Sequence, residues 1–250
     1  MIGRIFTVAL LAGLAAGLLI SVVQEFTTTP IILHAEKFEA AEAASPTARH
    51  ARLNLEDRGL TGVRLYLAHG PAADGHGAEA ETWGPEDGLE RTFFTSLTNI
   101  LTAIGFALIL TAVIYIRGRA VDGRTGVLWG AAGFCAVSLL PSLGLPPEVP
   151  GAFAAELTAR QGWWIFCAAA SAAGLALMFL GSDRWMPWAG ISLLVLPHVV
   201  GAPHPDQFGG AVPPELSAHF VSASLVTAAA FWAFLGWITG ALAKRYKLVA

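Results

Sequence analysis

Seven histidines are the side chains of this sequence best suited to metal chemistry. Imidazole and carboxylate groups together are good ligands for divalent first-row metal ions. Most candidates fall in two short segments, IILHAEKFE near the N-terminus and LPHVVGAPHPD near the C-terminus, where prolines and glycines interrupt apolar sequence. The last candidate histidine, His219, lies at the start of the final apolar run. The candidate metal ligands are therefore His34, Glu36, His198, His204, Asp206 and His219. A simpler interpretation, that polar residues merely collect in loops, stays open for all of them, and we favour it for His50, His69 and His76.

A second polar feature lies within an apolar run, in the segment RTFFTSLTNILT. Thr92, Thr95, Asn99 and Thr102 follow a spacing of three, four and three residues, which places them on one face of a helix. An asparagine at such a depth faces the bundle interior or a wet cavity. One interpretation is a hydrogen bond between helices. The other is a polar path that opens outward, with Gln24 beside it, lined by Glu25, Thr95, Asn99 and Thr102.

Several other chemistries lack their sequence signatures. No GxxxxGK[ST], HExxH or GxSxG motif is present, so we expect neither an ATPase nor another enzyme. A b-type haem would need histidines well inside facing helices, whereas His198 and His219 both lie near one surface. Cys135 and Cys167 fall inside apolar runs and are typical of buried thiols. We therefore expect no catalytic residues and no permanently bound cofactor.

Composition indicates the kind of element that must position these residues. Of the 250 residues, 55% are hydrophobic and 13% charged, where a soluble domain usually has about 25% charged residues. The mean hydropathy is +0.60 and the net charge is −3, with no basic stripe for nucleic acid. The bilayer is the natural home for this excess of apolar residues, because a spanning helix needs about 20 of them in succession.

Six apolar runs predict an all-α integral membrane protein with about six transmembrane helices. The first is Ile5–Val23, which we interpret as a retained helix because no cleavage site follows it. The fifth is short and holds Pro187 and Pro197, so it is expected to be short or irregular. The predicted organisation is a first transmembrane helix over 1–24, an outer loop over 25–92, and a five-helix membrane domain over 93–250 with helices at about 93–116, 127–143, 162–180, 185–200 and 218–242.

Charge fixes the predicted orientation. With six alternating helices and the N-terminus inside, the inner segments hold eight basic residues and two acidic ones, Asp122 and Asp183. The short outer loops hold Arg160 as their one basic residue, against four acidic ones. This is a positive-inside pattern with both ends of the chain inside. Five crossings would place the basic tail Lys244–Lys247 outside, which argues against that number.

The outer loop is expected to begin with a helix over Ile31–Ala44 and to be loose over 70–90, where glycine and acidic residues dominate. Small residues recur every four positions in three of the runs, for example at Gly126 and Gly130. Such spacing lets helices approach closely in lipid and fits a bundle or a homo-oligomer.

Four stretches of the chain resemble the CbtA-type family of probable cobalt transporter subunits. They are the first apolar run ending in VQEF with PIILHAEKFE after it, GPEDGLERTFFTSLTNIL, LPSLGLPPEVPGAF with RQGWW, and LPHVVGAPHP. The resemblance extends over about residues 1–240 and is weakest between 46 and 80. It maps the motif histidines of the family onto His34 and His198, and His204 and Asp206 extend the second motif. The family is often described with five spans, whereas the charge count here favours six.

The resemblance implies a membrane subunit of a cobalt uptake system linked to cobalamin. Such a subunit is paired with a small single-span CbtB-type partner that carries a histidine-rich end. We therefore expect a multi-pass protein of the bacterial inner membrane that takes up Co²⁺ or a related divalent ion from the outer face. The alternative is a membrane scaffold or regulatory subunit that transports nothing itself.

Overall fold

The computed structural model describes residues 2–44, 85–205, 207 and 209–249, and every regular element within these ranges is a helix. The predicted all-α fold is confirmed, with five helices long and apolar enough to cross a membrane and one shorter apolar helix. The elements are α1 (Ile2–Phe26), α2 (Thr28–Ala43), α4 (Leu89–Arg117), α5 (Gly123–Phe134), the π-helical turn η1 (Cys135–Leu139), α6 (Leu140–Ser142), α7 (Leu157–Leu180), α8 (Met186–Val200) and α9 (Pro214–Arg245).

Most of the helices are longer than the apolar runs that predicted them. α4 begins at Leu89 rather than near 93, and α9 covers 32 residues from Pro214. Polar residues at the two ends of a run continue the helix, because their backbone N–H and C=O groups can go on forming helical hydrogen bonds outside the apolar layer. α8 is the predicted short fifth helix: its 15 residues span about 22 Å, against about 30 Å for the hydrocarbon core of a bilayer.

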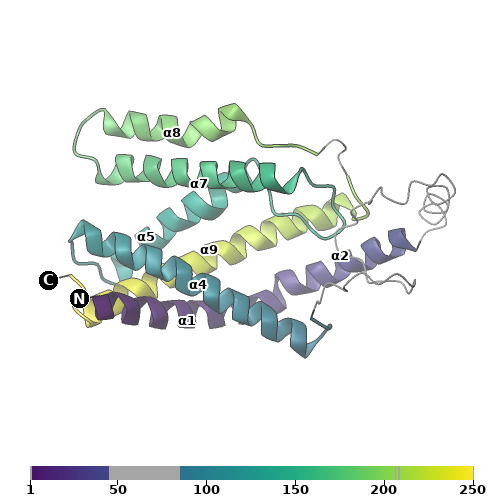
Figure 1. The fold of residues 1–250 in the computed structure, drawn as a ribbon, viewed down its shortest axis with the longest axis horizontal. Coiled ribbons are helices and arrows are strands. Elements are labelled where there is room, and N and C mark those ends of the chain that lie inside the picture. The colour runs from purple at the N-terminus through teal and green to yellow at the C-terminus, as the bar shows by residue number, and fades with distance from the viewer. Residues whose placement is uncertain (1, 45–84, 206, 208, 250) are drawn as a thin grey trace.

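The long helices alternate in direction, and both ends of the chain lie at one end of the bundle (Figure 1). Arg4 Nη1 donates a hydrogen bond of 3.1 Å to the carbonyl oxygen of Lys247, which ties the first helix to the C-terminal tail. The turns that connect α4 to α5 and α7 to α8 lie at this same end (Figure 1). We name it the basic end, because it carries the eight basic residues of the predicted inner segments. The opposite end, where α2 and the loops 143–156 and 201–213 lie, is the acidic end.

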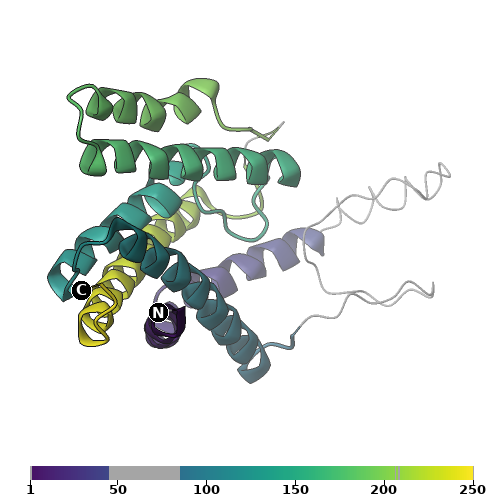
Figure 2. The ribbon, with the colours of Figure 1, turned by 60° about the vertical axis from the view of Figure 1, so that its left-hand side comes forward.

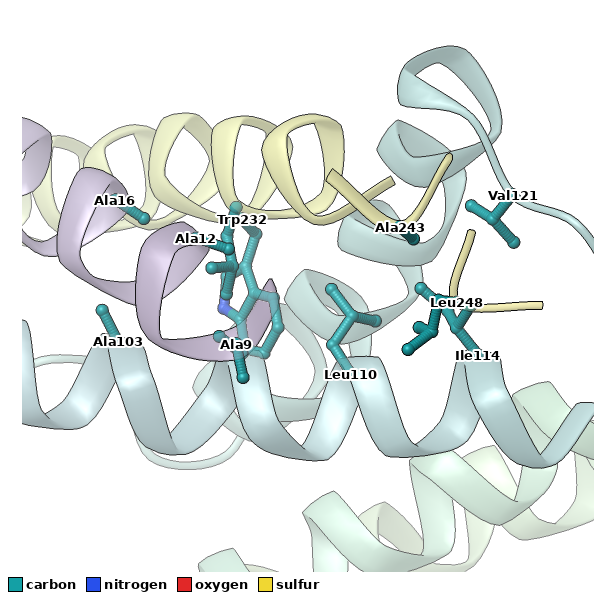
Figure 3. Close-up of a cluster of buried hydrophobic side chains, with 12 residues drawn as sticks. Ala9, Ala12, Ala16, Ala103, Leu110, Ile114, Val121, Trp232, Ala243 and Leu248 are labelled. Atoms are coloured by element: carbon teal, nitrogen blue, oxygen red, sulfur yellow. The ribbon is translucent and has the colours of Figure 1, made fainter. Parts of the chain in front are cut away.

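The main core forms where α1, α4 and α9 meet (Figure 3). α1 and α4 touch through backbone, since a Cβ added to Gly13 would lie 2.4 Å from the Cα of Ile104. Buried alanines such as Ala9 and Ala103 continue this close seam, and Trp232 of α9 fills the wider space beside it. Small residues on both helices therefore replace the interdigitated large side chains of a soluble core.

A second layer consists of the antiparallel pair α7 and α8 (Figure 2). Gly174 and Gly190 bring the two helices together, since a Cβ on Gly174 would lie 2.7 Å from the carbonyl oxygen of Gly190. The layer meets the rest of the bundle mainly where α7 packs on η1. Most of the apolar surface of α8 faces outward, as at Trp188 and Val199.

At the acidic end, α2 packs on the start of α9. This helix confirms the expected one at Ile31–Ala44, with boundaries shifted by a few residues. Ile31 and Ala35 form a small buried cluster with Val149, Val212 and Phe220 from the two loops and α9. A single bridge between Ala152 and Gly210 links those loops. The candidate metal ligands that the structure describes lie on or beside this cluster of α2, the two loops and the start of α9.

Candidate metal site

The two candidates on α2 have different surroundings. His34 is exposed, and its ring lies against Phe38 with centroids 5.3 Å apart. Glu36 is held by Arg91 of α4, whose two terminal nitrogens donate hydrogen bonds of 3.0 and 2.5 Å to its two carboxylate oxygens. A bidentate pair of this kind is among the stronger polar contacts in proteins. Glu36 therefore anchors α2 to the start of α4, and it would have to leave Arg91 to bind a metal ion.

His198 is the candidate whose ring lies deepest in the fold. It lies in the last turn of α8, directly after Pro197, and its ring meets the ring of Trp163 on α7 edge-on with centroids 5.9 Å apart. The indole nitrogen of Trp163 donates a 3.3 Å hydrogen bond to the carbonyl oxygen of Pro197. The Nε2 atom of His198 is buried and has no hydrogen-bond partner in the described part of the chain. A buried polar atom without a partner costs about 1–3 kcal/mol, so this nitrogen is disposed to accept a water or an ion.

The remaining candidates are more open. His204 lies in the loop that follows α8, and His219 is exposed in the second turn of α9. Asp206 lies outside the described residues. Among the residues that the structure does place, no three His, Cys, Asp or Glu side chains come close enough together to hold a metal ion. The candidates therefore share the acidic end without forming one closed site.

The proposed path residues also have different surroundings, since one is hydrogen-bonded between helices and the others are exposed. Asn99 Nδ2 donates hydrogen bonds to Gln24 Oε1 at 2.6 Å and Ser21 Oγ at 3.2 Å, so it joins α4 to α1. Thr95, Thr102 and Glu25 have exposed side chains. Asn99 therefore forms the hydrogen bond between helices that was one of the two interpretations of this polar face.

Two contacts of this end were not indicated by the sequence. Thr27 and Thr227 hydrogen-bond through their hydroxyl oxygens at 3.2 Å, which links the junction of α1 and α2 to α9. Arg91 holds Glu36 across 55 positions in the chain. A single threonine or arginine near an apolar run carries no information about its distant partner, so no sequence signal would have found either contact.

Two carboxyl groups at the acidic end, Glu148 and Glu156, have shifted pKa values. Burial raises the pKa of Glu148, although Arg160, whose Nη2 donates to it at 2.6 Å, opposes this shift. The backbone N–H groups of Thr158 and Ala159 lower the pKa of Glu156, which caps the start of α7. Both carboxylates therefore hold the loop before α7 in place.

A family model described as probable cobalt transporter subunit (CbtA) matches residues 2–244. The chain belongs to the CbtA family. Neither a curated protein nor a solved structure matches it significantly.

Membership in the CbtA family confirms the resemblance carried by the four sequence stretches. Together with five long apolar helices, it describes a multi-pass membrane protein of a transport system. Cobalt is the ion that the family description names, and the word subunit implies a partner chain.

Proposed function

We propose that this CbtA-family chain is the membrane subunit of an uptake system of the bacterial inner membrane, with Co²⁺ as its cargo. The acidic end faces outward and receives the ion, and the basic end faces the cytoplasm. The charge asymmetry supports this orientation of the protein in the membrane, because basic segments of membrane proteins remain on the cytoplasmic side. Carboxylates at the outer end would also raise the local concentration of a divalent cation.

The observation that carries the proposed site is the buried Nε2 of His198 at the acidic end, which has no hydrogen-bond partner among the residues that the structure places. In the proposal, His198 is the innermost ligand. The ligands that precede it on the surface are His34, Glu36, His204, Asp206 and His219. Because a transport site must release its ion, a partial and wet ligand shell suits it better than a closed cage.

The partner is proposed to complete this shell. A small single-span CbtB-type subunit with a histidine-rich end would supply further imidazoles at the acidic end, where the ligands of this chain remain apart. Glu25, Thr95, Asn99 and Thr102 are proposed to line part of the path once the partner covers their face.

The test is Co²⁺ uptake by proteoliposomes that contain the chain with and without this partner. The variant is His198→Ala combined with His219→Ala, and the matched control is His50→Ala combined with His69→Ala, which removes as many imidazoles. We expect uptake to fall at least about tenfold in the first pair, since each lost ligand weakens a metal site strongly, and to stay near wild type in the second. Equal uptake by both pairs would exclude this site.

One observation favours the alternative function, a scaffold or regulatory subunit. In the part of the chain that the structure describes, no three metal-binding side chains come together, and Asn99 is used to join helices. The same proteoliposomes distinguish the two functions. A scaffold would pass no Co²⁺ under any condition, yet its removal would destabilise the partner.

A further inference from the structure

A groove of about 420 Å³ opens on the side of the protein at the basic end, far from the candidate metal ligands. Its apolar wall consists of Val113 and Ile116 near the end of α4 and Leu180 at the end of α7. Arg117 and Arg119 complete it at the level where α4 ends. The groove thus combines apolar surface on the bilayer side with two guanidinium groups at its rim.

The helices on either side of the groove hardly touch each other. α7 packs on α8, η1 and α6, while α4 packs on α1 and α9, and the two layers stay apart in the view of Figure 2. Ile116 is 81% exposed and Val113 40%, so protein leaves Ile116 largely uncovered and Val113 partly uncovered at this point. In a bilayer an apolar space of this kind between helices is filled by an acyl chain, because no water is available at that depth.

The two arginines at the rim have no carboxylate partner in the part of the chain that the structure describes. Arg117 is instead oriented by Trp129 of α5, whose ring lies 5.9 Å from its guanidinium carbon. The nearest carboxylate in sequence, Asp122, accepts hydrogen bonds from Thr125 and caps α5. Two guanidinium groups are therefore available to an anion.

We propose that this groove binds an anionic phospholipid between the two helix layers. The lipid phosphate accepts hydrogen bonds from Arg117 and Arg119, and one acyl chain lies along Val113, Ile116 and Leu180. Arginine is suited to phosphate because its planar donors match the phosphate oxygens. Basic pockets between helices at the cytoplasmic side of a membrane are typical sites for anionic lipid headgroups. The bound lipid would then fill the space between α4 and α7. This proposal does not depend on which ion the protein carries.

The experiment is native mass spectrometry of the full-length protein in detergent, titrated with phosphatidylglycerol or with phosphatidylcholine of the same chains. Arg117→Gln combined with Arg119→Gln is the test variant. Arg124→Gln combined with Arg245→Gln removes the same charge from the same end and is the control. Val113→Trp fills the groove and keeps both arginines. Circular dichroism and gel filtration confirm that each variant is folded.

We expect wild type to retain phosphatidylglycerol more tightly than phosphatidylcholine by about tenfold or more. The Arg117/Arg119 pair and Val113→Trp should each lose this preference, the first through the headgroup and the second through the acyl chain. Inorganic phosphate at millimolar concentration should not displace the lipid. Equal losses in the Arg124/Arg245 control would mean general attraction to a basic surface, and displacement by phosphate would mean a site for free anions. Either result would overturn the proposal, as would unchanged binding in the test pair.

Discussion

Asn99 shows how a single polar side chain is used within a span of this protein. Its amide donates to Gln24 and Ser21 of α1, and the hydroxyl of Ser21 in turn donates to the carbonyl oxygen of Gly17 at 2.8 Å. In lipid these groups have no water to turn to, so each depends on the others. At the acidic end, outside the apolar layer, Glu36 and Arg91 likewise pair with each other. Asn99 and Glu36 are therefore bound by other side chains of the protein and would have to leave them to bind a metal ion.

Replacement of Asn99 by leucine should destabilise the protein by about 1 kcal/mol, since hydrogen bonds between transmembrane helices contribute about that much. The measurement is the unfolding equilibrium in mixed detergent micelles with increasing SDS. Thr102→Val is the matched control, because Thr102 lies one turn away with an exposed side chain. A control that costs as much as Asn99→Leu would contradict this role for Asn99.

Glu156 gives a prediction for pH at the same scale. Its pKa is lowered by the N–H groups of Thr158 and Ala159, so its charged form stabilises the start of α7. A carboxylate with a lowered pKa contributes stability above its unfolded pKa, near 4.5, and loses that contribution as the pH falls through the lowered value.

Glu156→Gln should therefore lower the melting temperature at about pH 7, and the difference from wild type should shrink as the pH falls below about 4. Thermal unfolding followed by circular dichroism across this range provides the measurement. Glu25→Gln, which removes an exposed carboxylate, is the control. A difference that stays constant down to acid pH would show that charge is not the reason for the effect.

At the scale of elements, helix contacts in this protein are made at glycines. α5 and α9 cross where Gly126 and Gly130 face Gly236 and Gly240, and a Cβ on Gly130 would lie 2.1 Å from the carbonyl oxygen of Trp232. Backbone lies against backbone there, so no flexible side chain can move aside. The spacing of small residues predicted such a seam, and the structure shows which helices share it.

Gly130→Ala should separate α5 from α9 and destabilise the fold by about 1–3 kcal/mol, the usual cost of overpacking. Gly105→Ala is its matched control, because a Cβ on Gly105 meets nothing within 4 Å. The control should be neutral or should stabilise α4 by up to about 1 kcal/mol, because alanine favours helix over glycine. Melting temperatures in detergent compare the two. If Gly130→Ala were as stable as Gly105→Ala, the close contact of α5 with α9 would be wrong.

At the scale of the whole molecule, the protein has two chemically different ends. Both termini and the turns from α4 to α5 and from α7 to α8, which carry basic residues, lie at one end, while α2 and the start of α9 lie at the other (Figure 1). The short α8 decides this arrangement, because it returns the chain to the acidic end before α9 begins. With five crossings the last helix would start at the basic end, and His198 and His219 would be separated from His34 by the membrane.

Cysteine labelling of intact cells tests this arrangement. In a background where Cys135 and Cys167 are replaced by alanine, a membrane-impermeant maleimide should label Ala154→Cys and Gln207→Cys. It should not label Arg119→Cys or Arg184→Cys until the cells are opened, because the basic turns face the cytoplasm. Failure of Gln207→Cys to react in intact cells, with labelling only after the cells are opened, would mean that α8 does not cross the membrane.

The sequence alone determined the membrane class, the number and order of apolar helices, the short fifth helix and the family. These follow from hydropathy, charge and local motifs, which are properties of neighbouring residues. Only the tertiary structure decided which polar groups pair, because partners such as Glu36 and Arg91 lie 55 positions apart and the pairing depends on how the helices cross. The structure likewise placed the buried Nε2 of His198 and the groove beside Arg117. Apolar periodicity indicates that a helix is buried in lipid or in protein. Close packing at the glycines then decides which neighbouring helix it contacts.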